Sequence, residues 1–170
     1  MNYLPKELFI FLILELIAVA WIDFKYRKIS NIWVLLNFII FLLIYFILGL
    51  NLSFELYQLY YPTIFFIVGF AFYTLRIMGG GDSKFLVSIY IILPVFFHES
   101  FLISLLYVTT FVGLVQFIIN SISGRDLIYK FLKYKNPKYL RLCYGKKFPF
   151  APIILLSWII FGMNNFEFIK

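Results

Sequence analysis

The chain of 170 residues is 64% hydrophobic and only 14% charged, with a mean hydropathy of +0.96. Ordinary soluble domains are about 45–50% apolar, so this composition excludes that class and indicates a membrane protein. One cysteine and one histidine also exclude an internal disulfide framework and a cysteine- or histidine-rich metal centre.

Six apolar segments follow one another along the chain, and each is expected to form a membrane-spanning helix. Such a helix needs about 20 mostly apolar residues, with a range of about 17–25, and a bilayer offers no partners to open backbone groups in other conformations. The fourth and sixth segments are short, so they either extend into their flanks or do not fully cross. The sequence therefore predicts an all-α integral membrane protein with one membrane-embedded domain over residues 1–170. The expected spans are residues 8–22, 32–50, 61–78, 85–97, 101–119 and 148–162.

Basic residues segregate to one side of this arrangement. The connections after spans one, three and five hold 13 of the 15 Lys and Arg residues, whereas the opposite side holds only Lys6 and Lys170. Cytoplasmic loops are enriched in Lys and Arg, so both chain ends are expected outside and these three connections in the cytoplasm. The net charge of +7 therefore indicates an anionic cytoplasmic leaflet as partner, and no nucleic acid.

The longest connection is the basic loop from Asn120 to Lys147. Within it, residues 125–134 alternate charged and apolar residues, and the apolar ones cluster at helical spacing. This pattern predicts a short basic amphipathic helix lying on the anionic cytoplasmic leaflet. A substrate-docking role is the alternative.

Two aspartates lie at the cytoplasmic edge, Asp23 just after the first span and Asp82 just before the fourth. A carboxylate beside hydrocarbon is costly and usually marks chemistry or transport. Two carboxyl groups brought close together share a proton because like charges repel, and such a pair can activate a water and protonate a peptide leaving group. This chemistry is peptide hydrolysis with no metal, no cofactor and no covalent intermediate. A structural interpretation is equally open, in which Asp23 pairs with Arg27 and Asp82 caps the fourth helix.

Other polar residues have simpler expectations. Glu15 precedes Asp23 by about 12 Å along the first helix, and it should face the bundle or stay protonated, with a structural hydrogen bond favoured over catalysis. His98 and Glu99 are expected in a solvated outer turn, and Cys143 is expected to be an inert loop thiol.

Residues 79–84, Gly-Gly-Gly-Asp-Ser-Lys, resemble the Gly-x-Gly-Asp-x-Lys signature of the type IV prepilin peptidases, which are intramembrane aspartyl proteases. Residues 23–31 resemble that family's other catalytic segment, in which an aspartate at the end of the first helix leads to an arginine, an isoleucine, usually a proline, and an asparagine. Residues 148–152, Phe-Pro-Phe-Ala-Pro, look like the family's Pro-Phe-Ala-Pro stretch, which opens the last helix. Presenilin and the signal peptide peptidases share the Gly-x-Gly-Asp element, but there the first aspartate follows a tyrosine and lies mid-membrane.

By this resemblance, Asp23 and Asp82 are the catalytic pair. The neighbouring glycines would provide a tight turn and close approach of substrate, and nearby polar residues would support the site electrostatically. Ser30 stands where the family usually has proline, which makes the local turn less rigid. The site-supporting residues implied by the resemblance are Gly79, Gly81, Lys84, Arg27 and Asn31.

The resemblance implies a leader peptidase in the cytoplasmic (inner) membrane, which cuts one bond on the cytoplasmic side of a pilin-like membrane precursor. The implied substrate has a short basic leader, a glycine before the cut and a hydrophobic helix behind it. Larger bifunctional members carry paired Cys-x-x-Cys motifs that accompany N-methylation, so this chain, with one cysteine, is expected to be a peptidase only. It looks like the short kind found with tight-adherence (Flp) pili or archaeal pilins and archaellins. The alternative from another class is a non-enzymatic membrane subunit or a small proton- or cation-coupled transporter, for which midplane carboxylates in repeated halves are typical.

Overall fold

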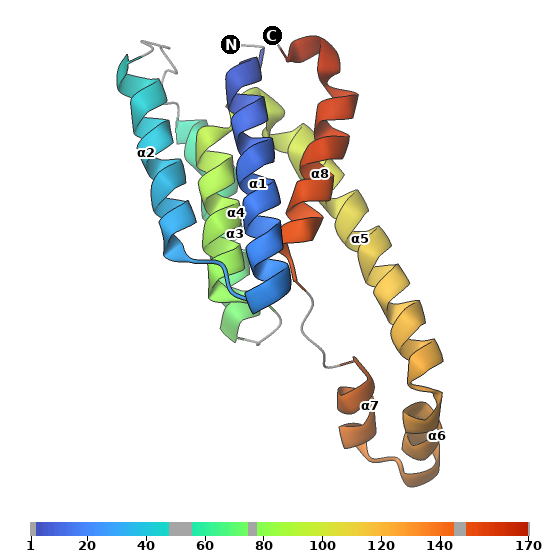
Figure 1. Ribbon diagram of the computed structural model, residues 1–170. Helices are drawn as coiled ribbons and strands as arrows, with labels where there is room; N and C mark the ends of the chain where they lie inside the picture. Colours follow the sequence, from blue (N-terminus) through green and yellow to red (C-terminus); the bar gives the residue numbers. More distant parts are fainter. Residues whose placement is uncertain (1–2, 48–55, 75–77, 145–148, 170) are drawn as a thin grey trace.

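The computed structural model describes residues 3–47, 56–74, 78–144 and 149–169, and the regular elements in these ranges are all helices. Short 3-10 turns lie at Leu56–Leu59, Val95–Phe97 and Phe166–Phe168. The α-helices are α1 Lys6–Tyr26, α2 Asn31–Ile47, α3 Tyr60–Thr74, α4 Gly80–Ile92, α5 His98–Ser123, α6 Arg125–Tyr134, α7 Pro137–Tyr144 and α8 Ala151–Asn164. Within these ranges, α1 to α5 and α8 form a bundle, and α6 and α7 form a hairpin beyond one end of it (Figure 1).

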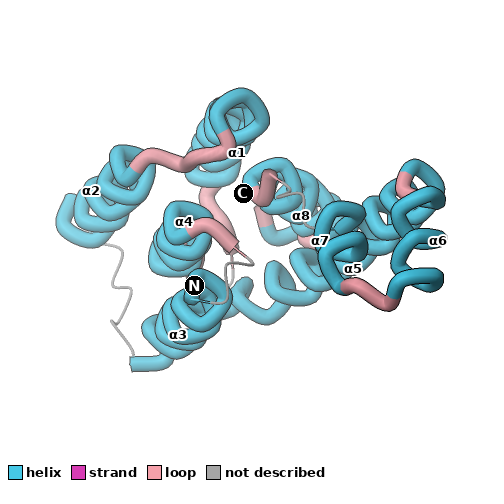
Figure 2. The backbone as a smooth tube through the Cα atoms, turned by 90° about the horizontal axis from the view of Figure 1, so that it is seen from below, coloured by secondary structure: helices cyan, strands magenta, loops and turns pink. Residues whose placement is uncertain are grey.

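The short helix α4 lies inside the bundle. Seven of its 13 residues are buried, and it packs against α2 on one side and α3 on the other. Helix α1 packs mainly against α8, which in turn packs against α5. Seen along the bundle, α4 lies between α2, α3 and the pair of α1 and α8 (Figure 2).

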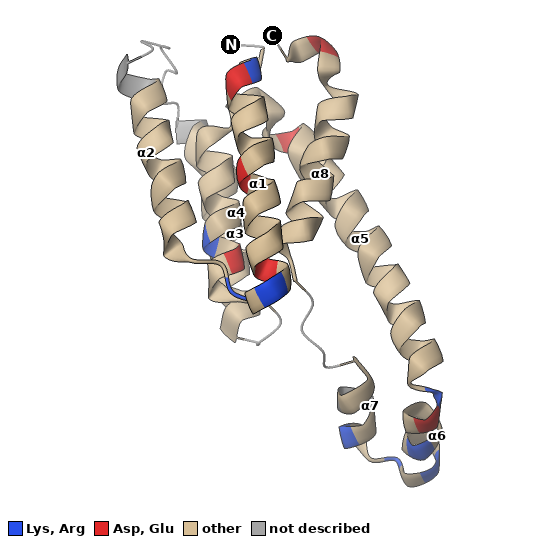
Figure 3. Ribbon diagram, viewed as in Figure 1, with Lys and Arg blue, Asp and Glu red and all other residues tan. Residues whose placement is uncertain are grey.

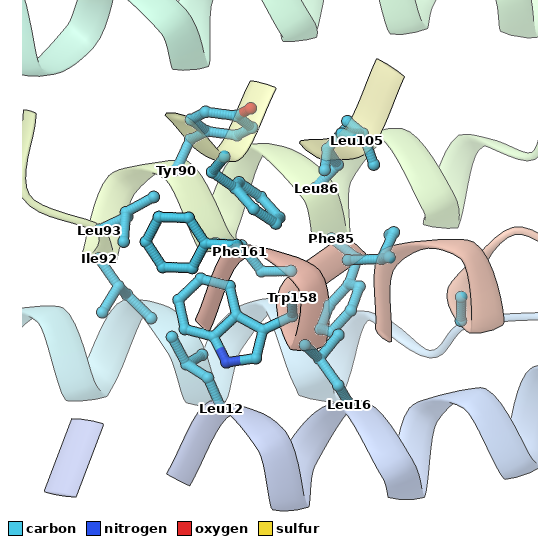
Figure 4. Close-up of a cluster of buried hydrophobic side chains, with 14 of the residues drawn as sticks. Leu12, Leu16, Phe85, Leu86, Tyr90, Ile92, Leu93, Leu105, Trp158 and Phe161 are labelled. Atoms are coloured by element: carbon cyan, nitrogen blue, oxygen red, sulfur yellow. The ribbon is translucent and has the colours of Figure 1, made fainter. Parts of the chain in front are cut away.

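Large aromatic side chains fill the core between α1, α4, α5 and α8 (Figure 4). The indole of Trp158 and the ring of Phe101 meet edge to face, with centroids 5.3 Å apart. Phe161 packs against the same two rings at 5.0 and 5.8 Å. Each of these three side chains is completely buried, and aromatic pairs in this geometry contribute about 0.5–1.5 kcal/mol beyond the area that they bury. The core therefore holds α1, α4, α5 and α8 in place relative to one another, and the end of α1 and the start of α4 carry the candidate site.

Both ends of the chain lie at the same end of the bundle (Figure 1). The Leu4 amide donates a hydrogen bond of 2.8 Å to the Phe168 carbonyl, which ties the first described residues to the last. The end of α1 and the start of α4 lie at the opposite end of the bundle (Figure 1).

Residues 125–144 of the basic loop form the hairpin α6–α7, which lies beyond the site end of the bundle (Figure 1). Helix α6 covers Arg125–Tyr134, which confirms the predicted helix in this region, and none of its residues is buried. Helix α7 was not predicted. It packs on the end of α5 through Cys143, whose thiol is buried and donates to the Asn120 carbonyl. Lys and Arg gather on this hairpin (Figure 3).

The six expected spans correspond to α1, α2, α3, α4, α5 and α8, with shifted ends. Within the described ranges, one helical stretch, Val95–Ser123, is long and apolar enough to cross a membrane by itself, while α2, α3 and α8 are shorter apolar helices. The expected span ends at residues 48–50 and 75–77, and the expected start at Phe148, fall outside the described residues.

The expected solvated turn at His98 is wrong. His98 begins α5 and is completely buried, and its Nε2 atom is 2.8 Å from the Leu93 carbonyl oxygen. The ring meets Tyr90 and Tyr61 edge to face, at centroid distances of 5.3 Å. A single histidine in a polar-looking connection gives no sequence signal for this aromatic enclosure.

Candidate active site

Asp23 lies in the last turn of α1 and is buried, with 3% of its surface exposed. Its Oδ2 atom accepts a hydrogen bond of 3.0 Å from the backbone amide of Ala151, the first residue of α8. Helix α1 ends three residues later because Arg27 adopts a left-handed conformation (φ 51°), and its amide donates to the Asp23 carbonyl. Asp23 therefore places its carboxyl group against the N-terminus of another helix.

Asp82 is the third residue of α4 and is partly buried. Its Oδ2 atom accepts a hydrogen bond of 3.0 Å from the Gly79 amide, which precedes the helix. This contact satisfies one of the open amides at a helix start. The capping contact of the structural interpretation is thus present for Asp82. For Asp23, the observed carboxylate bond goes to Ala151, and Arg27 contacts Asp23 through its backbone.

Gly81 brings the start of α4 against the connection between α1 and α2. A β-carbon added at Gly81 would lie 2.7 Å from the carbonyl oxygen of Ile29, so only glycine permits this approach. Ile29 itself is buried, with 5% exposed. Gly81 lies within the first turn of α4, not in a tight turn, and the close approach that it allows is to the chain's own backbone.

A cavity of about 1000 Å³ opens at this end of the bundle. Its walls come from the end of α1, the connection to α2, the second half of α3 and the start of α4. Asp82 lines it together with all five site-supporting residues that the sequence predicted. Asp23 is not among the lining residues, although its neighbours Ile22 and Tyr26 on α1 are. The lining residues are Ile22, Tyr26, Arg27, Lys28, Ile29, Ser30, Asn31, Ile32, Phe66, Gly69, Phe70, Tyr73, Gly79, Gly80, Gly81, Asp82, Ser83 and Lys84.

The cavity combines a basic rim with an aromatic wall. Arg27, Lys28 and Lys84 line it and are exposed, so they bring positive charge to the cavity. Preorganised cationic and dipolar groups stabilise negative charge that develops in a transition state. Exposed aromatic side chains of α3, among them Phe66 and Phe70, form another part of the wall. Such a cavity suits a substrate that is apolar on one side and reacts at a polar group on the other.

A model of the type IV leader peptidase family matches residues 10–122. The chain belongs to the type IV leader peptidase family. The match begins in α1, ends in α5 and includes Asp23, Asp82 and every residue that lines the cavity. Membership supports a peptidase over the transporter and the non-enzymatic subunit. No curated protein and no solved structure matched the chain.

Several site residues could not be recognised from the sequence. The aromatic residues of α3 look like ordinary lipid-facing bulk, and only Gly69 hints that this helix packs closely on another. A β-carbon on Gly69 would lie 2.6 Å from the side chain of Ser83, so α3 and α4 are in close contact beside the cavity. The Ala151 amide carries no side-chain signal at all.

Proposed function

We propose that the chain is an aspartyl endopeptidase of six membrane spans that removes the leader of type IV pilin-like precursors at the cytoplasmic membrane face. The observation that carries this proposal is the cavity of about 1000 Å³ that Asp82 shares with the last turn of α1, inside the region matched by the family model. Asp23 and Asp82 are the proposed catalytic pair, and no N-methyltransferase activity is expected.

The proposed reaction is general acid–base hydrolysis. The ionised carboxyl takes a proton from a water molecule, whose oxygen attacks the scissile carbonyl carbon. The neutral carboxyl then donates its proton to the leaving nitrogen as the C–N bond breaks. Arg27 and Lys84 stabilise the negative charge that develops on the carbonyl oxygen. No metal or cofactor takes part in this scheme.

The Asp23 carboxyl must reach the cavity for this scheme to operate. In the structure it is bonded to Ala151, and Ile22 and Tyr26 on either side of it line the cavity. We expect substrate binding to draw the carboxyl from the start of α8 toward Asp82. The backbone bond from Arg27 to the Asp23 carbonyl leaves the side chain free to turn without unwinding α1.

Substrate is expected to enter sideways from the bilayer along α3. This helix exposes large apolar residues such as Phe66, Ile67 and Phe70 beside the cavity, which suits a hydrophobic helix lying in the membrane. The hairpin α6–α7 would rest on the anionic cytoplasmic leaflet, with both chain ends on the outer side.

Coexpression with a prepilin-like membrane protein tests the proposal. The precursor is expected to lose its leader only when this chain is present, and a precursor whose glycine before the cut is replaced by a bulky residue serves as the uncleavable control. Mass analysis of the new N-terminus should show an unmethylated residue. Cleavage should persist with a metal chelator. No cleavage of any matched precursor, or cleavage that the chelator stops, would contradict the proposal.

A further inference from the structure

Three buried polar side chains meet at one level of the bundle. Glu15 on α1, Asn37 on α2 and Ser88 on α4 have exposed fractions of 4%, 0% and 4%. The surrounding core is apolar, so these groups cannot form hydrogen bonds with solvent. Their mutual contacts therefore decide whether the three helices fit together.

Each of these residues sits on a helix that carries a proposed site residue at its site end. On α1 and α4 these are the two aspartates, Asp23 and Asp82, and on α2 it is Asn31. The separations along the helices are six or eight residues. At 1.5 Å per residue, the polar level lies about 9–12 Å from the level of the aspartates.

Hydrogen bonds already join two of the three helices at this level. Asn37 donates from Nδ2 to Ser88 Oγ over 2.9 Å, and Ser88 in turn donates to the Phe85 carbonyl over 2.7 Å. The Glu15 carboxyl lies beside the Asn37 side chain. Both carboxyl oxygens and Asn37 Oδ1 nevertheless lack a partner that satisfies strict geometry. Since these three atoms are all acceptors when Glu15 is ionised, a hydrogen-bond donor is missing between Glu15 and Asn37.

A proton on Glu15 supplies that donor. It removes the charge from a carboxyl group held in an apolar interior, and it provides an O–H group that Asn37 Oδ1 can accept. We propose that Glu15 is a neutral carboxylic acid that donates to Asn37 and so completes a hydrogen-bonded chain from α1 through α2 to α4. Glu15 and Asn37 are then positioning residues for the aspartate pair, a role that rests on the proposed peptidase function.

The proposed hydrogen bonds from α1 through α2 to α4 would link helices that otherwise pack in separate pairs. Helix α1 packs mainly against α8, whereas α4 packs against α2 and α3, so the two aspartates belong to different packing pairs. Apolar contacts are non-directional, but a hydrogen bond fixes the distance and angle between the groups that it joins. A misplacement of about 1 Å can reduce a catalytic rate about 100-fold.

Infrared difference spectroscopy tests the protonation state without reference to any enzymatic activity. Wild-type protein in lipid nanodiscs at neutral pH is compared with Glu15→Gln. The carbonyl stretch of a protonated carboxylic acid should be present in the wild type and absent from the variant. Carboxylate bands in its place would show that Glu15 is ionised and would overturn the proposal, whether or not the protein proves to be a peptidase.

Kinetic variants test the positioning role. Glu15→Gln keeps a donor for Asn37, so its kcat should stay within about twofold of the wild type. The double change Glu15→Leu with Asn37→Leu leaves no orphaned polar atom, so folding and Tm should be retained. Its kcat should nevertheless fall about tenfold or more, with a smaller change in KM. Ser157→Ala, which removes a buried hydroxyl bonded within α8, is the matched control and should leave kcat unchanged.

Two results would overturn the positioning role. One is a wild-type kcat in the stable double-leucine variant. The other is a loss in Glu15→Gln as large as in the double-leucine variant, which would mean that the charge is needed. Absence of cleavage by the wild type would instead count against the proposed function, and the infrared result would still decide the state of Glu15.

Discussion

Asp23 near the end of α1 and Ala151 at the start of α8 are joined by a hydrogen bond of 3.0 Å between residues 128 positions apart in the chain. The bond fixes a buried carboxylate at a helix start and closes the last bundle helix onto the first. The same aspartate is a proposed catalytic residue, so its structural and chemical roles need to be separated by experiment.

Stability measurements on two Asp23 variants isolate the structural role. Asp23→Asn keeps an oxygen that accepts the Ala151 amide, so its free energy of unfolding should stay close to that of the wild type. Asp23→Ala leaves that amide without its partner and should lose about 1–3 kcal/mol. Thermal unfolding in detergent measures both. Equal losses in the two variants would show that the bond to Ala151 does not stabilise the fold.

Replacement of Gly81 by alanine tests the approach of α4 to the α1–α2 connection. The new β-carbon would lie 2.7 Å from the Ile29 carbonyl oxygen, which belongs to backbone and cannot swing away. We expect a loss of about 1–3 kcal/mol in stability, together with reduced cleavage. Gly113→Ala is the matched control because its β-carbon meets nothing within 4 Å in the middle of α5. That variant should gain about 0.5–1 kcal/mol, and equal effects at both glycines would contradict the proposed contact.

The orientation in the membrane can be measured with reporter fusions. A reporter inserted at Asn136, between α6 and α7, should report a cytoplasmic location, whereas one fused after the last residue should report an external one. The basic residues of the hairpin underlie this expectation, as Figure 3 shows. The same location for both reporters would exclude an odd number of spans between them and thus refute the six-span topology.

Charge removal from α6 tests its contact with anionic lipid. Lys130→Gln with Lys133→Gln removes two charges from a helix that has no buried residues, and each basic residue near an anionic surface contributes about 1 kcal/mol. In nanodiscs that contain anionic lipid, amide hydrogen exchange over residues 125–134 should be faster in this variant than in the wild type. Lys6→Gln, at the opposite end of the bundle, should leave this exchange unchanged. If residues 125–134 of the wild type exchange as slowly in zwitterionic nanodiscs as in anionic ones, lipid charge plays no part in their protection.

Hydropathy predicted the helices well because each apolar segment carries its own signal. The expected spans all contain the central parts of observed helices, and the alternation of charged and apolar residues placed α6 correctly. The sequence does not predict α7, because its eight residues are too few for a clear periodic pattern. Its first residue is a proline, which is common at the start of a helix but does not by itself indicate one. Hydropathy predicts a helix start at Phe85, whereas α4 starts at Gly80, because the glycines before Phe85 disfavour a helix in isolation.

The candidate site could be predicted in part. The residue types near Asp82 carry a recognisable motif, and the structure gathers them around one cavity. Contacts between distant segments carry no such signal: the Ala151 amide, the Ile29 carbonyl and the aromatic wall of α3 become visible only when the helices are packed. The sequence predicts that Glu15 faces the bundle, and Glu15 is buried, but the proposed contact with Asn37 depends on how the helices pack.

The most direct measurement is leader cleavage by Asp23→Asn and Asp82→Asn, each coexpressed with a precursor that the wild type cleaves. Asparagine keeps the hydrogen bonds to Ala151 and Gly79, so both variants should insert and fold normally. Neither asparagine can take up or donate a proton as a carboxyl does, so each variant should lose cleavage to below about 1% of the wild type. Undiminished cleavage by either folded variant would show that its aspartate only caps a helix, and would contradict the aspartate pair.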